Sequence, residues 1–343
     1  MNAVSAMPQP LVSPPQDLLR RPLRDLRLSV IDACNFRCPY CMPASRIGND
    51  HGMDASQRLS FDAIETLVRG FARLGVRKLR ITGGEPLLRK DLPALIRRLA
   101  RIDGIDDLAM TTNGALLARH AHALRDAGLH RLTVSMDALD PAIFRTLSGG
   151  RGDIGQVLDG LIAAQDAGFS AIKLNCVVQL GINDGEIVPL TEFARAHGHT
   201  MRFIEYMDVG TCNGWDRARV LPSARVRDRI HARWPLRALQ PRYRGEVAAR
   251  YGFIDGQGEV GLISSVSQPF CGDCQRARVS ADGRLFTCLF ASEGADLRAA
   301  LAQGDETLAV QVAALWTRRA DRYSELRDAL PTRRHVEMFL IGG

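Results

Sequence analysis

Short apolar runs and longer segments with helical spacing alternate along the first two thirds of the chain. Six runs typical of buried strands lie at residues 26–31, 78–82, 107–112, 131–136, 171–178 and 201–206. Between them, apolar residues three and four apart predict helices over residues 61–74, 91–101, 116–127, 154–167 and 184–196. Strands that alternate with helices predict an α/β protein with a parallel sheet, and right-handed crossovers would curl six such units into a partial (β/α)6 TIM-like barrel.

Single residues at the helix ends support this pattern. Ser60 can cap the helix that follows it, because its hydroxyl can accept a hydrogen bond from a free backbone N–H group. Gly128 and Gly168 each follow a predicted helix directly, where glycine accommodates the left-handed backbone of a helix C-terminus.

The alternation stops after residue 209. A hairpin is predicted at residues 281–284 and helices at 295–301 and 307–319, so residues 211–343 are interpreted as a smaller C-terminal α+β domain. Residues 23–210 then form the barrel. Residues 1–22 are interpreted as a flexible tail, since four prolines fall within the first sixteen residues: Pro8, Pro10, Pro14 and Pro15.

Composition excludes several classes of protein. No stretch approaches the ~18 consecutive apolar residues of a membrane span, and the N-terminus has no apolar segment typical of a signal peptide. We therefore expect a cytoplasmic protein without membrane contact. The formal charge of +7 has two interpretations, a generally basic surface or a pocket for a polyanion.

The first candidate metal site follows the first predicted strand. Cys34, Cys38 and Cys41 lie within eight residues of each other. Three thiolates around one cluster leave one iron for a ligand that is not protein, whereas structural zinc needs a fourth protein ligand. His51 is the nearest zinc-binding candidate, but its spacing does not match a zinc finger.

A second cysteine trio lies in the C-terminal region. Cys271, Cys274 and Cys288 combine a Cys-x2-Cys turn with a cysteine returned by the predicted hairpin. A zinc ribbon is the alternative and would need Cys212 as its fourth ligand. Two sites that each lack one ligand indicate iron–sulfur clusters that bind small molecules.

Gly83-Gly84-Glu85-Pro86 follows the second predicted strand. The glycines permit close approach of the backbone to a ligand, and the Glu85 carboxylate suits a ligand ammonium group. The loop is expected beside the first cysteine trio, because loops that follow parallel strands meet at one end of the sheet.

These motifs resemble those of the radical S-adenosylmethionine (SAM) superfamily. The resemblance extends to the GTP 3',8-cyclase (MoaA) family through the segments at 28–43, 111–114 and 134–139, the second cysteine trio and the terminal Gly342-Gly343. It implies two 4Fe–4S clusters, on Cys34, Cys38 and Cys41 and on Cys271, Cys274 and Cys288, with SAM as a second cofactor.

The resemblance also implies the binding residues. SAM contacts are implied for Tyr40, Gly84, Glu85, Ser135 and Met207. GTP contacts are implied for Arg27, Arg80, Thr111, Lys173, Arg276, Ala277 and Arg278. Lys173 stands out on its own, because it interrupts an apolar strand and a buried lysine needs an anionic partner. Lys78 adds charge on the same strand face as Arg80.

The implied reaction is the first step of molybdenum cofactor synthesis. Reductive cleavage of SAM yields a 5'-deoxyadenosyl radical, which removes the 3' hydrogen of GTP, and the C3' radical adds to C8 of guanine. Catalytic roles are implied for Arg276, Gly342 and Gly343. The implied partners are a one-electron reductant and cyclic pyranopterin monophosphate synthase, which receives the product. Family members are often homodimers, although no feature of the sequence indicates dimerisation.

Two rival functions remain at this stage. A peptide-modifying radical enzyme would carry more auxiliary cysteines and a peptide-binding region. A nucleic-acid-binding zinc protein would fit the basic charge, but the sequence lacks complete zinc ligand sets and a basic-aromatic array. It also lacks a Gly-x4-Gly-Lys-[Ser/Thr] loop, so a P-loop nucleotide site is not expected.

Overall fold

One curved sheet organises the molecule. The computed structural model describes residues 13–42, 52–211, 213–329 and 335–342. In this part of the chain, twelve strands follow the order β12-β11-β10-β1-β2-β3-β4-β5-β6-β9-β8-β7. The first six are β1 (Asp25–Ser29), β2 (Lys78–Thr82), β3 (Asp107–Thr112), β4 (Arg131–Ser135), β5 (Lys173–Val178) and β6 (Thr200–Glu205). They run parallel to one another, which confirms the predicted parallel sheet.

Strands from the C-terminal third extend this sheet at both edges. β10 (Arg276–Val279) lies parallel beside β1, and β9 (Glu259–Ile263) lies parallel beside β6. The outer strands are antiparallel and comprise β11 (Arg284–Phe286), β12 (Ala295–Asp296), β8 (Ala249–Phe253) and β7 (Leu236–Leu239). Strands from before and after residue 210 therefore belong to one continuous sheet. The division into domains at residues 23–210 and 211–343 stays a prediction.

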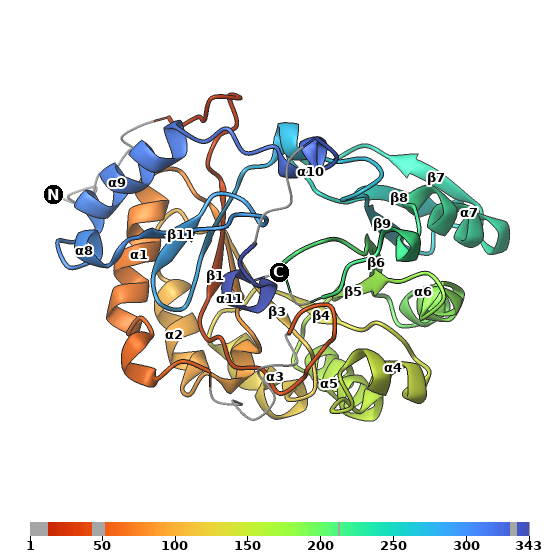
Figure 1. The fold of residues 1–343 in the computed structure, drawn as a ribbon. Coiled ribbons are helices and arrows are strands. Elements are labelled where there is room, and N and C mark those ends of the chain that lie inside the picture. Colours follow the sequence, from red (N-terminus) through yellow and green to blue (C-terminus); the bar gives the residue numbers. More distant parts are fainter. Residues whose placement is uncertain (1–12, 43–51, 212, 330–334, 343) are drawn as a thin grey trace, which may run out of the picture.

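Helices cover the outer side of the sheet (Figure 1). Five of them lie where the sequence predicts them, within a few residues: α1 (Phe61–Arg73), α2 (Leu92–Leu99), α3 (Leu117–Asp126), α5 (Ile154–Asp166) and α6 (Ile187–Ala196). The Ser60 hydroxyl accepts a hydrogen bond from the Ala63 N–H at 3.1 Å, so the predicted cap is confirmed. Gly128 and Gly168 have φ angles of 97° and 86°, as expected after a helix.

The C-terminal region departs further from its prediction. The prediction of a helix over residues 295–301 is wrong at its start. Ala295–Asp296 is strand β12, and the helix α8 (Arg298–Leu301) begins only at Arg298. The Asp296 carboxylate accepts a hydrogen bond from the Arg298 N–H at 2.9 Å, which favours a helix start there. The predicted hairpin is confirmed by the antiparallel pairing of β10 and β11.

Several elements were not predicted from the sequence. These are α4 (Pro141–Leu147), α7 (Ser223–Arg233), α10 (Tyr323–Leu326), α11 (Met338–Ile341) and strands β7 to β9, whereas α9 (Asp305–Thr317) matches the helix expected at 307–319. α7 buries only Ser223, Val226 and Ile230. Its apolar pattern is therefore too sparse to indicate a helix.

The two faces of the sheet differ in chemistry. Leu174, Cys176 and Val178 of β5 are buried on one face, while Lys173 and Asn175 alternate with them on the other. Aliphatic side chains pack under the helices, and polar side chains line the concave inner face. Among the described residues, no helix has both the length and the apolar character needed to cross a membrane.

The end of the predicted tail is packed against the fold. Asp17 and Arg21 are 5% and 1% exposed, and the backbone of Gln16 pairs with that of Pro22. A buried ion pair needs well-placed partners to offset the cost of desolvation, so residues 16–22 belong to the folded molecule. This corrects the expectation of a flexible tail for that part of residues 1–22.

Candidate active site

A single cavity brings both cysteine trios together. It has a volume of about 320 Å³ and lies on the concave side of the sheet. All six cysteines of the two trios line it: Cys34, Cys38, Cys41, Cys271, Cys274 and Cys288. The strand ends of β1 and β10 bring the two loops to it, although more than 200 residues separate them in the chain.

The first trio lies on a compact loop after β1. The N–H groups of Cys41 and Met42 both donate to the Cys38 carbonyl, each at 2.9 Å. The Cys34 sulfur accepts from the Phe36 N–H at 3.4 Å and from Asn113 Nδ2 at 3.9 Å. Burial raises the pKa of Cys34 to about 11. These thiols ionise readily only beside a metal centre, which deprotonates a coordinating thiol.

The second trio comes from two places in the chain. Cys271 begins the 3-10 turn η6 (Cys271–Asp273), Cys274 follows this turn directly, and Cys288 lies just after the end of β11. Burial would raise the pKa of Cys274, but the guanidinium groups of Arg276 and Arg319 outweigh it and lower this pKa to about 6. At Cys288, burial and the Asp321 carboxylate raise the pKa to about 12. The Cys288 sulfur accepts a hydrogen bond from the Phe290 N–H at 3.4 Å.

The donor sets fit clusters better than single metal ions. Within the described ranges, no three His, Cys, Asp or Glu side chains are arranged to hold one metal ion. The ligands of a 4Fe–4S cluster each bind a different iron, so they stand further apart than the ligands of one zinc. His51 and Cys212, the fourth zinc ligands considered above, lie outside the described residues.

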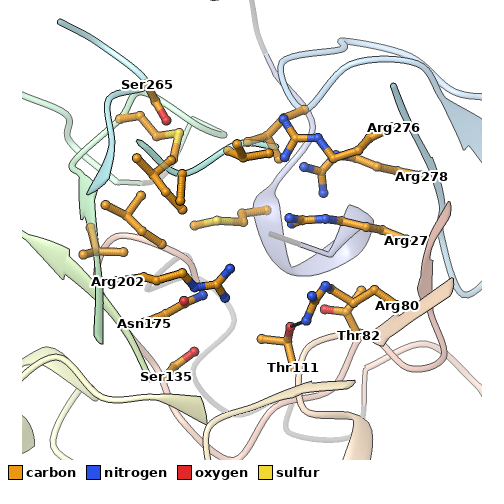
Figure 2. A pocket seen from close by; sticks show the side chains of 18 of the residues that line it. Arg27, Arg80, Thr82, Thr111, Ser135, Asn175, Arg202, Ser265, Arg276 and Arg278 are labelled. Atoms are coloured by element: carbon orange, nitrogen blue, oxygen red, sulfur yellow. Dashed lines mark hydrogen bonds between the residues drawn. The ribbon is translucent and has the colours of Figure 1, made fainter. Parts of the chain in front are cut away.

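Arginines form one wall of the cavity. In the register of the sheet, Arg278 of β10, Arg27 of β1 and Arg80 of β2 lie side by side. Figure 2 shows their guanidinium groups and that of Arg276 pointing into the cavity. Burial lowers the pKa of Arg278 to about 10, and Arg276 adds to the shift. Such a row of like charges is costly to bury without an anionic partner.

Arg202 reaches toward this wall from the opposite side (Figure 2). It pairs in register with Asn175, which in turn pairs with Ser135. Its Nε atom is buried without a hydrogen-bond partner in the described structure. Burial and the nearby Arg80 lower the pKa of Arg202 to about 9. This side chain therefore adds a further cationic donor to the cavity.

Arg80 is the middle residue of β2, and Lys173 is the first residue of β5. Arg80 Nη1 donates to the Thr111 and Thr133 hydroxyls, both at 3.1 Å, so neutral partners hold it in place. Burial lowers the pKa of Lys173 to about 7, and Arg202 adds to the effect. Lys173 thus lies at the amino end of its strand and Arg80 in the interior of its own, whereas the first cysteine loop follows the carboxyl end of β1.

The Gly83-Gly84 backbone lies against the first cysteine loop. A Cβ atom on Gly84 would come within 2.2 Å of the Ala33 carbonyl oxygen, and one on Gly83 within 2.4 Å of that of Ile31. Gly84 lines the cavity as expected. Its lack of a side chain is also required by the loop that carries Cys34.

Glu85 differs from its expected placement. Its side chain is 1% exposed and is absent from the cavity lining. The carboxylate accepts hydrogen bonds from the Leu87 N–H at 3.0 Å, the Thr112 hydroxyl at 2.7 Å and the Asn113 N–H at 2.7 Å. Glu85 therefore joins the loops after β2 and β3 instead of presenting a free carboxylate to a ligand.

We expect Gly84→Ala to damage the first cluster site. The added methyl group overlaps the Ala33 carbonyl, and overpacking of this kind costs about 3 kcal/mol at the upper end of its range. Chemical denaturation should show this loss. On the expectation of one cluster for each trio, the iron content should fall by about half, because only the second trio would still bind fully. Gly185→Ala is the control, since no heavy atom lies within 4 Å of its added Cβ. Equal iron and stability in both variants would contradict the expectation.

Of the other residues predicted to contact SAM or GTP, most line the cavity, and one is buried within the sheet. Tyr40, Ser135, Met207, Thr111 and Lys173 line the cavity. The Tyr40 hydroxyl donates to Asp137 at 2.6 Å, which fixes the ring beside the first trio. Ala277 is 0% exposed and absent from the lining, because alternate residues of β10 face away from Arg276 and Arg278.

The C-terminal tail enters the centre of the molecule (Figure 1). The Gly342 carbonyl accepts a hydrogen bond from Arg278 Nη1. Gly342 has a φ of 67°, and an added Cβ would lie 2.1 Å from Thr82 Cγ2. Met338 and Phe339 line the cavity beside it. Gly343 lies outside the described residues.

Two known families match most of the chain. The Radical SAM superfamily model matches residues 28–194, and the model described as Molybdenum Cofactor Synthesis C matches residues 199–325. A GTP 3',8-cyclase of Xanthomonas campestris pv. campestris (strain B100) is 65% identical over 98% of this chain and 100% of its own length. A GTP 3',8-cyclase of Staphylococcus aureus (strain JH9) is 44% identical over 96% of this chain and 98% of its own.

The chain belongs to the GTP 3',8-cyclase family. As a GTP 3',8-cyclase, it is a radical SAM enzyme of molybdenum cofactor synthesis. Among solved structures, Streptococcus suis SuiB has a TM-score of 0.60 at 13% identity, covering 91% of this chain and 69% of that chain. At this identity the similarity shows the fold alone, a mixed α/β structure with the parallel sheet of radical SAM enzymes.

Proposed function

We propose that this cavity cyclises GTP between C3' and C8 of one bound molecule, with SAM and two 4Fe–4S clusters as cofactors. In this proposal the strands form a partial barrel, and the C-terminal region carries the second cluster. The observation that carries the proposal is the convergence of both cysteine trios and a row of arginines on one cavity. A zinc-binding nucleic-acid protein would need neither the enclosed arginines nor two incomplete thiolate sets.

Cys34, Cys38 and Cys41 would hold the first cluster, and the backbone around Gly84, the Tyr40 ring and Ser135 would hold SAM beside it. When bound and reduced, this cofactor pair supplies the 5'-deoxyadenosyl radical that abstracts hydrogen. The protein chain holds the cofactors in position and excludes water from the site. Asp137 fixes Tyr40 through the 2.6 Å hydrogen bond, and Glu85 ties together the loops on which Gly84 and Asn113 lie.

The arginine row would bind the triphosphate. Arg27, Arg80 and Arg278 present neighbouring planar groups, which suit bidentate hydrogen bonds to phosphate oxygens. Arg202 approaches from the opposite wall and Lys173 also lines the cavity, so an anion between the walls would be held from both sides. Bound phosphates would also relieve the repulsion among these buried cations.

Cys271, Cys274 and Cys288 would hold the second cluster, at which the guanine base binds. Fixing the triphosphate at one point and the base at another orients the ribose between them. Orientation of this kind contributes up to about 7–11 kcal/mol to lowering a barrier in well-placed systems. Arg276, which lies between Cys274 and the arginine row, contacts both parts of the substrate in this proposal.

We expect GTP affinity to depend on the protonation of Lys173. In the free enzyme the pKa of Lys173 is lowered to about 7, and a bound phosphate raises it. The affinity for GTP is therefore highest below pH 7. It falls as the pH rises above 7, by up to about tenfold per pH unit. Calorimetry at pH 8 in buffers of different ionisation enthalpy should show proton uptake on GTP binding.

Lys173→Arg is the matched control for this measurement, because its guanidinium stays charged throughout the range. The difference in proton uptake between the two proteins isolates Lys173 from other titrating groups such as Glu85, whose pKa burial raises to about 7. Equal proton uptake in both proteins would show that Lys173 is already charged, or makes no contact with GTP.

Anaerobic turnover tests the proposed function. The reconstituted chain should bind about eight irons and, with SAM, dithionite and GTP, should release 5'-deoxyadenosine and a nucleotide isomeric with GTP but chromatographically distinct. Formation of 5'-deoxyadenosine with unaltered GTP would favour a radical enzyme with another substrate, such as a peptide. A physiological one-electron reductant and transfer of the product to cyclic pyranopterin monophosphate synthase complete the proposal.

A further inference from the structure

A buried ionic network joins the N-terminal segment to the second cysteine trio. Asp17 Oδ2 accepts a hydrogen bond from Arg21 Nε at 2.6 Å and another from Arg319 Nη1 at 3.2 Å. The side chains of Asp17 and Arg21 are fully removed from solvent, and that of Arg319 is 1% exposed. The Asp17 carboxylate therefore joins two segments that lie about 300 residues apart in the sequence.

Both arginines also bind the loop that carries the second trio. Arg21 Nη1 donates to the Cys271 carbonyl at 2.6 Å and to the Asp321 carbonyl at 2.8 Å. Arg319 Nη1 donates to the Cys274 carbonyl at 2.8 Å, and its positive charge helps to lower the pKa of the Cys274 thiol. The two ends of the Cys-x2-Cys turn are thus each held by one buried guanidinium group.

A contribution to the stability of the fold does not by itself explain why these charged side chains are buried. Buried ion pairs seldom stabilise a fold more than apolar side chains of similar volume, because both charges lose their hydration. Here two buried guanidinium groups share Asp17, and Asp321 lies 3.4 Å from Arg319 Nε. The Asp17 and Asp321 carboxylates balance the two guanidinium charges. The guanidinium groups, however, are the groups that contact the backbone of Cys271 and Cys274, so the positive side of the network faces the place where a cluster held by three thiolates would carry negative charge.

Charge and hydrogen bonds at cluster sulfurs are established determinants of reduction potential. A cation and an N–H donor beside a thiolate favour the more negative, reduced form of a cluster, and so raise its potential. The rigid attachment to Cys271 and Cys274 would also hold the ligand sulfurs in place before the cluster binds.

We propose that Asp17, Arg21 and Arg319 are positioning residues of the second cluster, which hold Cys271 and Cys274 in place and raise the reduction potential of the cluster. This inference rests on the proposed function, because it takes the second trio to hold a cluster. It assigns a functional role to the segment before β1, which by sequence alone was interpreted as tail.

The test isolates the second cluster. In a full-length background with Cys34, Cys38 and Cys41 replaced by Ala, only the second trio can bind iron, and its potential is measured by redox titration followed by EPR. Arg319→Met is expected to shift the potential to a lower value, since it removes the charge and the donor to Cys274. Arg319→Lys keeps a charge but cannot reach Asp17 and Cys274 together, so a smaller shift to lower potential is expected.

Asp17→Asn tests the positioning role. It leaves both arginines without their shared carboxylate, so the iron content of the background protein is expected to fall at unchanged far-UV circular dichroism. Arg24→Gln is the matched control, because Arg24 is an exposed arginine of the same segment. Its potential and iron content should equal those of the background.

The outcomes separate the two proposals. A background protein that binds no cluster would refute the second cluster and, with it, that part of the proposed function. A background protein that binds its cluster, with unchanged potential and iron in Arg319→Lys and Asp17→Asn, would overturn the present inference alone. If the Arg319→Met protein does not fold, the reduction potential and iron content of Arg319→Lys and Asp17→Asn still test the inference.

Discussion

Deletion of Gly342 and Gly343 is expected to abolish cyclisation while both clusters remain bound. The Gly342 carbonyl accepts a hydrogen bond from Arg278, and its backbone lies against Thr82 in a space that admits no side chain. Loss of the tail would free the Arg278 guanidinium and open the cavity to water. Misplacement of a reacting group by about 1 Å is sufficient to reduce a rate roughly a hundredfold, so we expect at least that loss in cyclised product.

The same reaction mixtures supply the control for the deletion. Iron content and SAM cleavage without GTP should match those of the intact chain, because the contacts of Gly342 described above are with Arg278 and Thr82 and none of the cysteines of the first trio is among them. Gly342→Ala should show the same defect in milder form, through its strained φ and the contact with Thr82. Product formation by the truncated enzyme at the normal rate would show that the tail has no part in the reaction.

Replacement of Arg80 by Met is expected to have the second largest effect. Arg80 is 6% exposed and is held by the Thr111 and Thr133 hydroxyls, so its remaining donors are available to a phosphate. Hydrogen bonds to charged groups contribute about 1.5–3 kcal/mol, which corresponds to a loss of roughly 10- to 150-fold in kcat/KM for GTP. Steady-state kinetics under anaerobic conditions measure this directly.

Arg77→Met is the matched control for Arg80. Arg77 is a neighbouring arginine whose side chain is 59% exposed and paired with Asp106 outside the cavity. Its kcat/KM should remain within twofold of the parent. Arg80→Lys should recover little, because an ammonium group cannot keep both threonine contacts and still bind phosphate in a bidentate manner. Equal kinetics for Arg80→Met and Arg77→Met would remove Arg80 from the GTP site.

The sequence allowed the parallel strands and the cysteine chemistry to be predicted, because both depend on local pattern. Apolar runs of five to eight residues mark the strands, and spacing alone identifies the two trios. Lys173 was identified by its place within an apolar strand. Arg202 lies in the same way between Met201 and Phe203 of β6, and this pattern is the sequence signal for a residue that was not predicted.

Long-range pairing could not be predicted in this way. The row of Arg278, Arg27 and Arg80 depends on the register of β10 beside β1, which only the folded chain fixes. The internal role of Glu85 depends on donors from Leu87, Thr112 and Asn113 that local pattern does not reveal. The burial of Asp17 and Arg21 likewise depends on Arg319, about 300 residues away.

The origin of the abstracted hydrogen tests the central claim most directly. The account predicts that GTP deuterated at C3' transfers its label, so that mass spectrometry finds 5'-deoxyadenosine heavier by one mass unit after anaerobic turnover. Unlabelled 5'-deoxyadenosine, formed at the same rate with labelled GTP, would contradict the placement of the ribose between the two cysteine trios.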